Sequence, residues 1–513
     1  MVRRGVLAVG VCSMCILGCG SSTRGPGTMG AGGPDSGVPG AAALSVSPTA
    51  QRVLAGSGAV SLRATLVGDS VPIGWTLSGP GTLGPSSGPQ TTYTPPATVD
   101  AETTATVTAN AGPRLRSAVT ITVVPSTEVD VAGRVVGLLG NGLTGLTVAI
   151  GDRTTTTGAD GRFSIPGVTP PYDLAIVLSG TPVMAGLYHG LTRPDPTLVF
   201  LFFVDSIGAK TGVISGTVSG GDPIPSDGEV TGAVFASPEA SGVVSIGSRD
   251  YSLPLSWFGP ATTIGTVHLL QWRTPMPGAP PTAYTAFGTV TAIRVTDGET
   301  VSVGNDPLYD PGAASISGTA VPPAGYQLFS KTLDLEFADD AILPIGGETN
   351  AETHFAFPVP GNITLTAVVT AAARLDGTGD TFRRESGITR GATDVTIVLP
   401  TPAVPSTPVD GGTGVSTSTD FRWRPLAGGV HLAIFNGEAT KPSFYVVTAE
   451  ASTHIPDLPA LGAALPSASR YSWFVVGYAP FASVDAYTGI GALVPPIGSF
   501  EGSISDPRGF TTR

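Results

Sequence analysis

The chain has 513 residues, with 26 lysine or arginine against 38 aspartate or glutamate side chains and a formal net charge of −12. Charged residues make up only 12% and form no basic cluster, which argues against nucleic acid as a partner, because binding to a polyanion requires clustered cations. The length predicts several domains. Short Val, Ile, Leu and Thr runs between 70 glycines and 47 prolines favour folded β-structure over disorder.

Residues 1–18 are predicted to be an export signal. An apolar stretch follows Arg3 and Arg4 and ends at Gly18; it is too short to span a bilayer but has the length of a signal-peptide core. Its end, Ile16-Leu17-Gly18-Cys19, resembles the bacterial lipobox. The resemblance implies that Cys19 is acylated, becomes the first residue of the mature protein and attaches it to a membrane. The alternative is an ordinary secretory peptide that happens to contain cysteines.

Cys19 is then the single cysteine of the mature chain, because Cys12 and Cys15 lie inside the signal. Disulfides, thiolate zinc sites and cysteine nucleophiles are excluded together. Loss of the two arginines changes the net charge to −14. By resemblance to lipoproteins, Gly20 at the second mature position implies the outer membrane, where an aspartate would imply inner-membrane retention. The predicted location is lipid-anchored in the outer membrane, facing the surface or the periplasm.

Residues 19–43 are rich in glycine, serine and proline without periodicity, which predicts a flexible tether spanning roughly 25–30 Å as a coil. Residues 44–125 follow as short alternating runs separated by turn residues. Ile73-Gly74-Trp75-Thr76-Leu77 and Tyr93-Thr94-Pro95-Pro96 resemble bacterial immunoglobulin-like repeats. A tryptophan on a central strand fills such a core without a disulfide.

Residues 129–205 carry the most specific pattern. A threonine run at 154–157 leads into Asp160-Gly161-Arg162-Phe163, where the Asp-Gly pair suits a tight hairpin. This arrangement resembles the carboxypeptidase regulatory-like, transthyretin-type sandwich, which is not the catalytic domain in that family. The run from Leu198 to Val204 is apolar on both faces, which indicates a central strand or one covered by a neighbouring module.

The opening strand around Gly133 recurs around Gly216 and Gly318, at intervals of 83 and 102 residues. One module type used three times is therefore predicted, with further β-sandwiches at 211–308 and 313–400. Residues 403–513 resemble a fibronectin type III module, because Phe421-Arg422-Trp423 and Tyr471-Ser472-Trp473 match that family's core aromatic positions. The predicted fold class is all-β: tandem immunoglobulin-like and prealbumin-like β-sandwiches after a lipoprotein signal peptide and tether.

Motifs that suggest chemistry are weak. Gly79-x-Gly81-x-x-Gly84 fits a dinucleotide loop but opens no helix, and the five histidines have no metal-ligand spacing. No catalytic residue, cofactor-binding residue or metal ligand is predicted, and the chain is not expected to be an enzyme. Trp257, Phe258 and Trp272 are close enough in sequence to form an aromatic platform for sugar rings; the alternative is that they fill a core.

The predicted function is a non-catalytic, membrane-anchored surface lipoprotein that presents β-sandwiches for adhesion, ligand binding or envelope scaffolding. Its partners would be the membrane, through Cys19, and an unknown protein or polysaccharide. A carbohydrate-binding surface protein is one alternative, and an atypical glycoside-acting hydrolase with carboxylates on loops is another.

Overall fold

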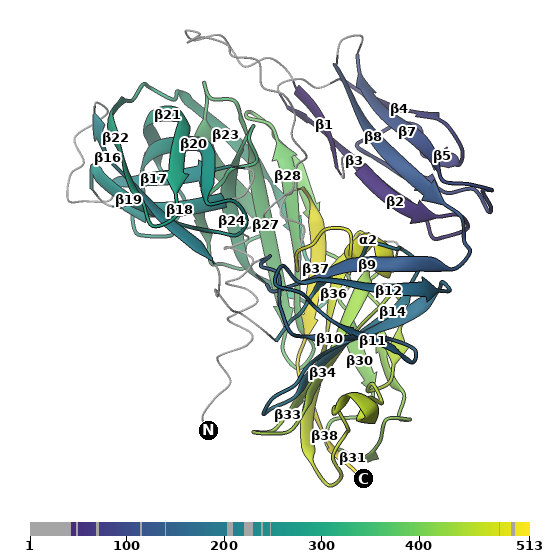
Figure 1. Ribbon diagram of the computed structural model, residues 1–513. Helices are drawn as coiled ribbons and strands as arrows, with labels where there is room; N and C mark the ends of the chain where they lie inside the picture. Colours follow the sequence, from purple (N-terminus) through teal and green to yellow (C-terminus); the bar gives the residue numbers. More distant parts are fainter. Residues whose placement is uncertain are drawn as a thin grey trace.

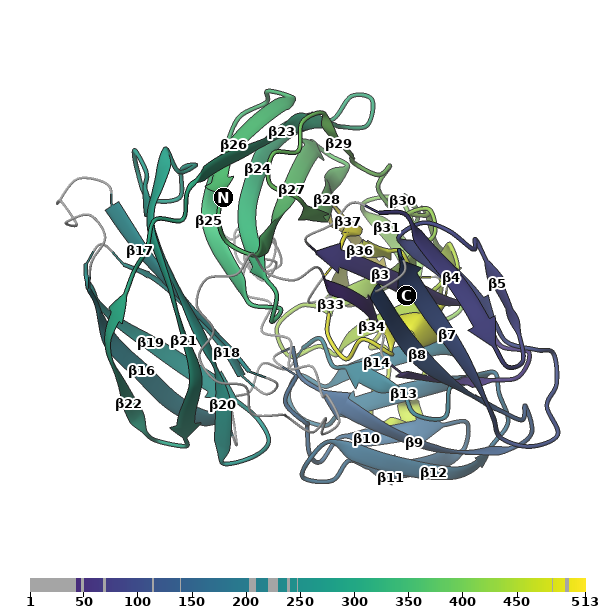
Figure 2. The ribbon, with the colours of Figure 1, turned by 90° about the horizontal axis from the view of Figure 1, so that it is seen from above.

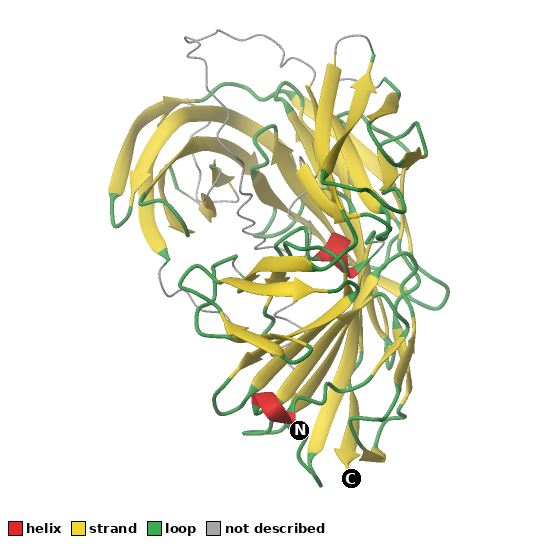
Figure 3. Cartoon of the chain, turned by 45° about the vertical axis from the view of Figure 1, so that its right-hand side comes forward, coloured by secondary structure: helices red, strands yellow, loops and turns green. Residues whose placement is uncertain are grey.

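A computed structural model describes residues 43–513 apart from 48–49, 68–70, 113–114, 139, 203–208, 220–228, 238–239, 247, 482 and 494–497. These residues form almost only β-strands (Figures 1 and 3); the helical elements among them are η1 (Pro459–Leu461) and α2 (Val484–Tyr487). The prediction of an all-β fold of tandem sandwiches is confirmed. The predicted signal peptide and the tether up to residue 42 lie outside the described residues.

The first sandwich consists of two four-stranded sheets, ordered β1-β3-β6-β5 and β2-β8-β7-β4. Trp75 is buried between them, and its indole N–H donates to the carbonyl oxygen of Gly88 at 2.8 Å. Tyr93 is also buried and donates its hydroxyl hydrogen to the carbonyl oxygen of Pro80 at 2.6 Å. The strands are β1 (Ala43–Ser47), β2 (Ala50–Leu54), β3 (Val60–Val67), β4 (Ile73–Ser78), β5 (Thr82–Gly84), β6 (Gln90–Thr94), β7 (Thr103–Ala111) and β8 (Leu115–Val124).

The next three sandwiches share one strand order. In each, the first strand pairs antiparallel with the fourth and parallel with the seventh. The second sandwich has β9 (Val129–Val136), β10 (Thr147–Ile150), β11 (Arg153–Thr156), β12 (Arg162–Val168), β13 (Tyr172–Leu178), β14 (Met184–Leu191) and β15 (Thr197–Val199). The third has β16 (Lys210–Ser219), β17 (Glu229–Ala236), β18 (Ala240–Ile246), β19 (Asp250–Trp257), β20 (Thr262–Arg273), β21 (Ala283–Thr296) and β22 (Thr300–Pro307). The fourth has β23 (Ala313–Val321), β24 (Gln327–Phe337), β25 (Ile342–Glu348), β26 (His354–Pro360), β27 (Leu365–Leu375), β28 (Gly379–Ile388) and β29 (Val395–Val398).

A glycine and an aromatic ring meet at the same place in all three. The pairs in register are Gly133 with Phe163, Gly216 with Tyr251, and Gly318 with Phe355. A β-carbon on each glycine would lie 2.6–2.8 Å from an atom of the opposite ring. The ring therefore lies across the bare glycine and covers a strand position that has no side chain of its own.

The sandwiches are not separate bodies, because the second, fourth and fifth share a 14-stranded sheet. Strand β14 pairs parallel with β34 (Ser443–Thr448). Strand β37 (Phe500–Ser505) pairs antiparallel with β36 (Arg470–Ala479) on one side and β28 on the other. The shared sheet runs through the middle of the molecule (Figures 1 and 2). The fifth sandwich contains β30 (Val404–Thr407), β31 (Gly412–Val415), β32 (Phe421–Arg424), β33 (Val430–Gly437), β34 (Ser443–Thr448), β35 (Ser452–Thr453), β36 (Arg470–Ala479), β37 (Phe500–Ser505) and β38 (Arg508–Thr512).

Both faces of the shared sheet are buried in the fifth sandwich. One face packs with Trp423 and Tyr471 in that sandwich's own core. The other face joins the core of the second sandwich, where Tyr445 contacts Phe200. The apolar segment that begins at Leu198 is thus covered by a neighbouring module, which was one of the two predicted explanations.

The third sandwich packs on the fourth. Its strands form one seven-stranded sheet, because β18 also pairs with β19. Val234, Leu270, Trp272 and Phe287 of this sheet belong to the hydrophobic cluster that fills the fourth sandwich. Seen from above in Figure 2, the third sandwich lies at the left of the fourth, and the first lies over the right side of the shared sheet.

Candidate functional site at the junctions between sandwiches

The predicted lipidation residue, Cys19, lies outside the described residues. Among the residues that are described, no helix is long and apolar enough to span a bilayer. The same part of the chain holds no group of three or more histidine, cysteine, aspartate or glutamate side chains arranged to bind a metal.

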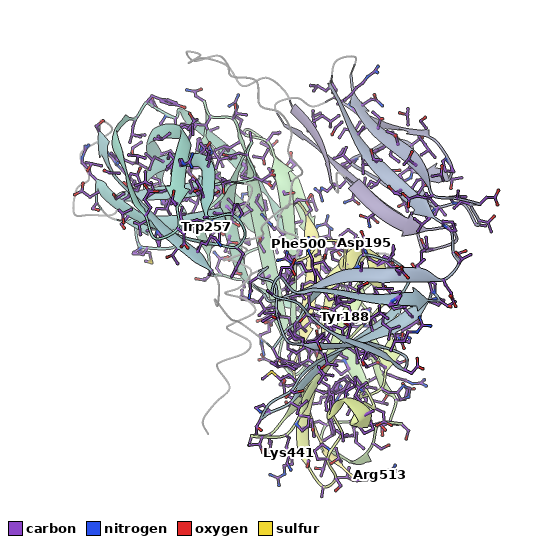
Figure 4. The ribbon with its side chains drawn as sticks, in the orientation of Figure 1. Tyr188, Asp195, Trp257, Lys441, Phe500 and Arg513 are labelled. Carbon is purple, nitrogen blue, oxygen red and sulfur yellow. The ribbon has the colours of Figure 1, made fainter. Side chains whose placement is uncertain are left out.

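The predicted aromatic platform is not formed. Trp257 and Trp272 are 1% and 2% exposed and belong to different hydrophobic clusters, one inside the third sandwich and one at its contact with the fourth. The indole N–H of Trp257 donates to the carbonyl oxygen of Pro260 at 2.9 Å, and Figure 4 shows this tryptophan among the strands of the third sandwich. Phe258 is half-buried next to it. The two tryptophans fill cores, so the glycan-contact prediction for them is wrong and the alternative holds.

The described polar groups of most interest lie where sandwiches meet. Arg63 on β3 of the first sandwich reaches the loop before β37. Its guanidinium donates to the carbonyl oxygen and hydroxyl of Ser499 at 3.3 and 3.0 Å, and to the hydroxyl of Ser386 on β28 at 3.4 Å. Burial lowers the pKa of Arg63, and the carboxylates of Glu385 and Glu336 oppose this effect. One arginine therefore connects the first sandwich to the fourth and the fifth.

A second arginine, Arg383 on β28, forms ion pairs close to the Arg63 contact. Arg383 donates through Nε and Nη2 to Glu385, both at 3.0 Å, and through Nη1 to Glu501 on β37. Burial raises the pKa of the Glu501 carboxyl, and Arg383 opposes that shift. The ion pair extends across the β28–β37 pairing, so it stabilises the place where the fourth and fifth sandwiches share their sheet.

Two carboxylates lie on the polar face of β24. Asp334 and Glu336 alternate with the core residues Leu333, Leu335 and Phe337. Burial raises the pKa of Asp334 to about 6 and also raises the pKa of Glu336, while the charge of Arg384 opposes both shifts. Shifted carboxyl groups are a common feature of catalytic sites, but ion-pair networks produce them too. Because the charge of Arg384 acts on both carboxyl groups, we assign this pair to the charged network where the first, fourth and fifth sandwiches meet.

A further junction holds α2 against the second sandwich. The carboxylate of Asp485 accepts hydrogen bonds from the backbone N–H groups of Thr192 and Arg193 at 2.9 and 3.1 Å, and from the Thr192 hydroxyl. The Arg193 guanidinium donates to the backbone oxygen of Asp485 at 3.0 Å and pairs with Asp195, which Figure 4 labels. A small space beside this group is lined by Gln51 and neighbouring residues of the first sandwich, so three sandwiches meet there.

His268 on β20 connects the third and fourth sandwiches. Its Nε2 lies 2.9 Å from a carboxylate oxygen of Asp339, its Nδ1 lies 3.3 Å from the Thr289 hydroxyl, and its ring stacks on Phe337 at 4.2 Å. Hydroxyl, imidazole and carboxylate in this order also form acyl-transfer sites. Here Asp339 and Phe337 both belong to the fourth sandwich, so the histidine acts as a contact between sandwiches.

In comparisons with known proteins, no family model and no curated protein matches the chain. Among solved structures, the Bacillus anthracis TIE protein is 10% identical over 71% of this chain and 75% of that chain, with a TM-score of 0.13. Domains 4–9 of the surface layer protein SbsC are 10% identical over 92% of this chain and 65% of that one, with a TM-score of 0.14. The eight N-terminal Ig domains of Down Syndrome Cell Adhesion Molecule are 9% identical over 83% and 66%, with a TM-score of 0.12. Scores this low carry no argument about function.

Sequence reasoning missed the junction residues for a physical reason. Arg63 lies between the buried residues Leu62 and Ala64, on a strand whose side chains alternate between core and surface. A charged residue at such a position is predicted to face solvent. Asp334 and Glu336 did leave a signal, because two acids alternate with core residues. Such a pattern marks the polar face of a strand but does not identify what covers it.

Proposed function

We propose that the protein is a lipid-anchored surface lipoprotein whose β-sandwiches form a stiff, non-catalytic scaffold that displays a binding or adhesive face. The Ile16–Cys19 sequence supports the anchor. The observation that carries the scaffold part is the shared 14-stranded sheet, which joins three sandwiches through backbone hydrogen bonds. Modules joined only by linkers would move independently, whereas modules that share a sheet hold fixed positions.

The junctions support the same proposal. Arg63 attaches the first sandwich to the shared sheet, and His268 attaches the third to the fourth. A body held at each contact suits the display of a surface of fixed shape at the end of the predicted flexible tether. The partner is a protein or a polysaccharide at the cell surface or in the envelope, and the membrane itself is bound through Cys19.

The anchor is tested by fractionation of cells that express wild type, Cys19→Ala or the matched controls Cys12→Ala and Cys15→Ala. We expect wild type and both controls in the outer-membrane fraction, labelled by a fatty-acid probe, and the Cys19 variant unprocessed or released. Globomycin, which blocks the lipoprotein signal peptidase, should cause the precursor to accumulate. Unchanged processing and fractionation of Cys19→Ala would overturn the anchoring proposal.

The display function is tested by proximity labelling on intact cells, comparing the anchored wild type with an exported, unlipidated version. Neighbours enriched only by the anchored form, and retained by the purified protein in a pull-down or on a glycan array, support a binding face. Turnover of polysaccharide or peptide substrates by the purified protein would contradict a non-catalytic role.

A further inference from the structure

Lys331 on β24 is a lysine with no solvent exposure. Lysine is rarely buried completely, because removal of its charge from water is costly unless partners compensate. Its Nζ lies 2.7 Å from Oδ1 of Asn350, 2.6 Å from the backbone oxygen of Glu352 and 3.3 Å from Oε2 of Glu348. An amine is thus held against a carboxamide, with a carboxylate beside it.

The carboxylate of Glu348 contacts both nitrogen atoms of this group. Its Oε2 lies 3.3 Å from Nζ of Lys331 and accepts a hydrogen bond from Nδ2 of Asn350 at 3.5 Å. A proton leaving the lysine can therefore reach the carboxamide nitrogen through one oxygen atom. General acid–base transfer requires such contact with both the donor and the leaving group.

The carboxamide oxygen has its own donor. The backbone N–H of Glu352 donates to Oδ1 of Asn350 at 3.1 Å. A fixed N–H aimed at a carbonyl oxygen stabilises the negative charge that develops there when an amine adds to the carbon. Nucleophile, electrophile, proton carrier and oxyanion donor are all present within one hairpin and the turn that follows it.

Strand pairing places these groups. Lys331 and Glu348 are register partners in the β24–β25 pair, so their positions are opposite each other. Gly347 permits the close approach, since a β-carbon there would lie 2.4 Å from the Lys331 backbone oxygen. The chain then turns after β25 and brings Asn350 back over the buried amine. Strand pairing therefore holds the lysine, asparagine and glutamate side chains close together, and their contact does not depend on the motion of an exposed side chain.

We propose that Lys331 and Asn350 join in an intramolecular isopeptide bond, with Glu348 as the proton carrier. Glu348 takes one proton from the lysine ammonium, and the neutral amine adds to Cγ of Asn350. Glu348 delivers that proton to Nδ2 and takes a second from Nζ. The Nζ–Cγ bond is then retained, the Cγ–Nδ2 bond breaks, and ammonia leaves with the last proton as ammonium. No oxidant, reductant or cofactor is required.

The proposed bond lies at the end of the shared sheet, where it would hold the terminal strand in place. β25 is the terminal strand of the 14-stranded sheet, and its outer edge pairs with no strand among the described residues. A loop of the third sandwich lies against this edge, where the Gly347 N–H donates to the carbonyl oxygen of Gly278 at 2.8 Å. Terminal strands of a sheet are the places where strands detach or pair with other chains. A covalent bond between β24 and the turn after β25 would fasten that edge to the sheet.

The experiment is mass spectrometry of the purified mature protein. Wild type should be lighter than its sequence by one ammonia, and trypsin should not cleave after Lys331. Trypsin together with a protease that cleaves before aspartate cuts at Asp334 and Asp339, between the two residues, and should yield a branched peptide joining Lys331 to Asn350. Lys331→Met, Asn350→Ala and Glu348→Gln should each lack the branched peptide and this mass loss. Lys441→Met, which changes an exposed lysine, should retain both.

The outcomes separate the parts of the proposal, and the wild-type measurement does not depend on whether a variant folds. A wild type of full mass, with linear peptides for both residues, overturns the isopeptide bond. A succinimide at Asn350 would give the same mass loss but leave two linear peptides, and this result would also overturn it. A Glu348→Gln protein that still forms the branched peptide overturns the role of Glu348 alone.

Discussion

Tyr445 of the fifth sandwich donates a hydrogen bond to the backbone oxygen of Val199 in the second, 246 residues away, at 3.2 Å. Tyr188 of the second sandwich donates to the same oxygen at 2.7 Å, and its ring meets that of Tyr445 edge to face. A phenol from one module thus completes the polar contacts of another, so the two modules share a core.

Truncation of Tyr445 should destabilise both sandwiches together. Tyr445→Ala removes a fully buried ring and should lower the free energy of unfolding by ~3–5 kcal/mol. Tyr445→Phe should cost only ~1 kcal/mol, because Tyr188 still satisfies the Val199 oxygen. Urea unfolding measures both, with Tyr309→Ala as an exposed control. An alanine variant as stable as the control would mean that the second and fifth sandwiches do not share this core.

Removal of Arg63 should loosen the first sandwich. Arg63→Ala loses hydrogen bonds to both serine residues, and bonds from a charged donor contribute ~1.5–3 kcal/mol. We expect faster proteolysis between the first and second sandwiches and a larger radius of gyration, with the fold of each sandwich unchanged. Arg116→Ala, at an exposed site on the same sandwich, is the control. Equal radii for the two variants would show that Arg63 does not hold the junction.

His431 should make stability depend on pH. It is 1% exposed, its Nε2 accepts from the backbone N–H of Leu426 at 3.0 Å, and burial lowers its pKa to about 4. The unfolded chain takes up a proton near pH 6.5 and the native state only near pH 4. Stability is therefore present above pH 6.5 and is lost as pH falls from 6.5 towards 4, by up to ~3 kcal/mol.

The measurement compares unfolding of wild type and His431→Gln from pH 7 to pH 4, since glutamine retains an acceptor but does not titrate. Asp334 acts in the opposite sense in this window because burial raises its pKa to about 6. The difference between the two proteins is therefore the readout, and it should shrink by ~3 kcal/mol on acidification. A difference independent of pH would contradict a buried neutral histidine.

Alanine at a repeated glycine should damage its sandwich. In Gly318→Ala the new β-carbon would lie 2.1 Å from the backbone oxygen of Val395 and 2.7 Å from the Phe355 ring. Overpacking of this kind costs ~1–3 kcal/mol. Gly74→Ala, where nothing lies within 4 Å, is the control and should not destabilise. Thermal unfolding ranks the two variants, and equal midpoints would show that the strand can shift without cost.

Local patterns were readable from the sequence. The repeat around Gly133, Gly216 and Gly318 was visible because a glycine beneath a ring is a requirement within one strand pair. The core of the first sandwich was visible through Trp75. Each of these features depends on residues close together in one module.

Non-local features were not readable. Pairing of β14 with β34 depends on backbone N–H and C=O groups that every strand edge carries, so no residue type in the sequence predicts it. The burial of Trp272 at the contact with the fourth sandwich could not be predicted either, since an aromatic residue is equally suitable for a sugar-binding surface and for an interface between sandwiches. The double-sided apolar run at Leu198 was the one sequence sign of contact between modules.

The pairing of β14 with β34 also constrains how the chain can be made and folded. A chain that emerges with its amino end first presents β14 long before Ser443 and the rest of β34 follow. During that interval an apolar strand edge is open to other chains, which is a hazard for aggregation. Folding of this chain therefore requires a holdase or rapid completion of the chain, and truncated chains that end after the fourth sandwich should be insoluble.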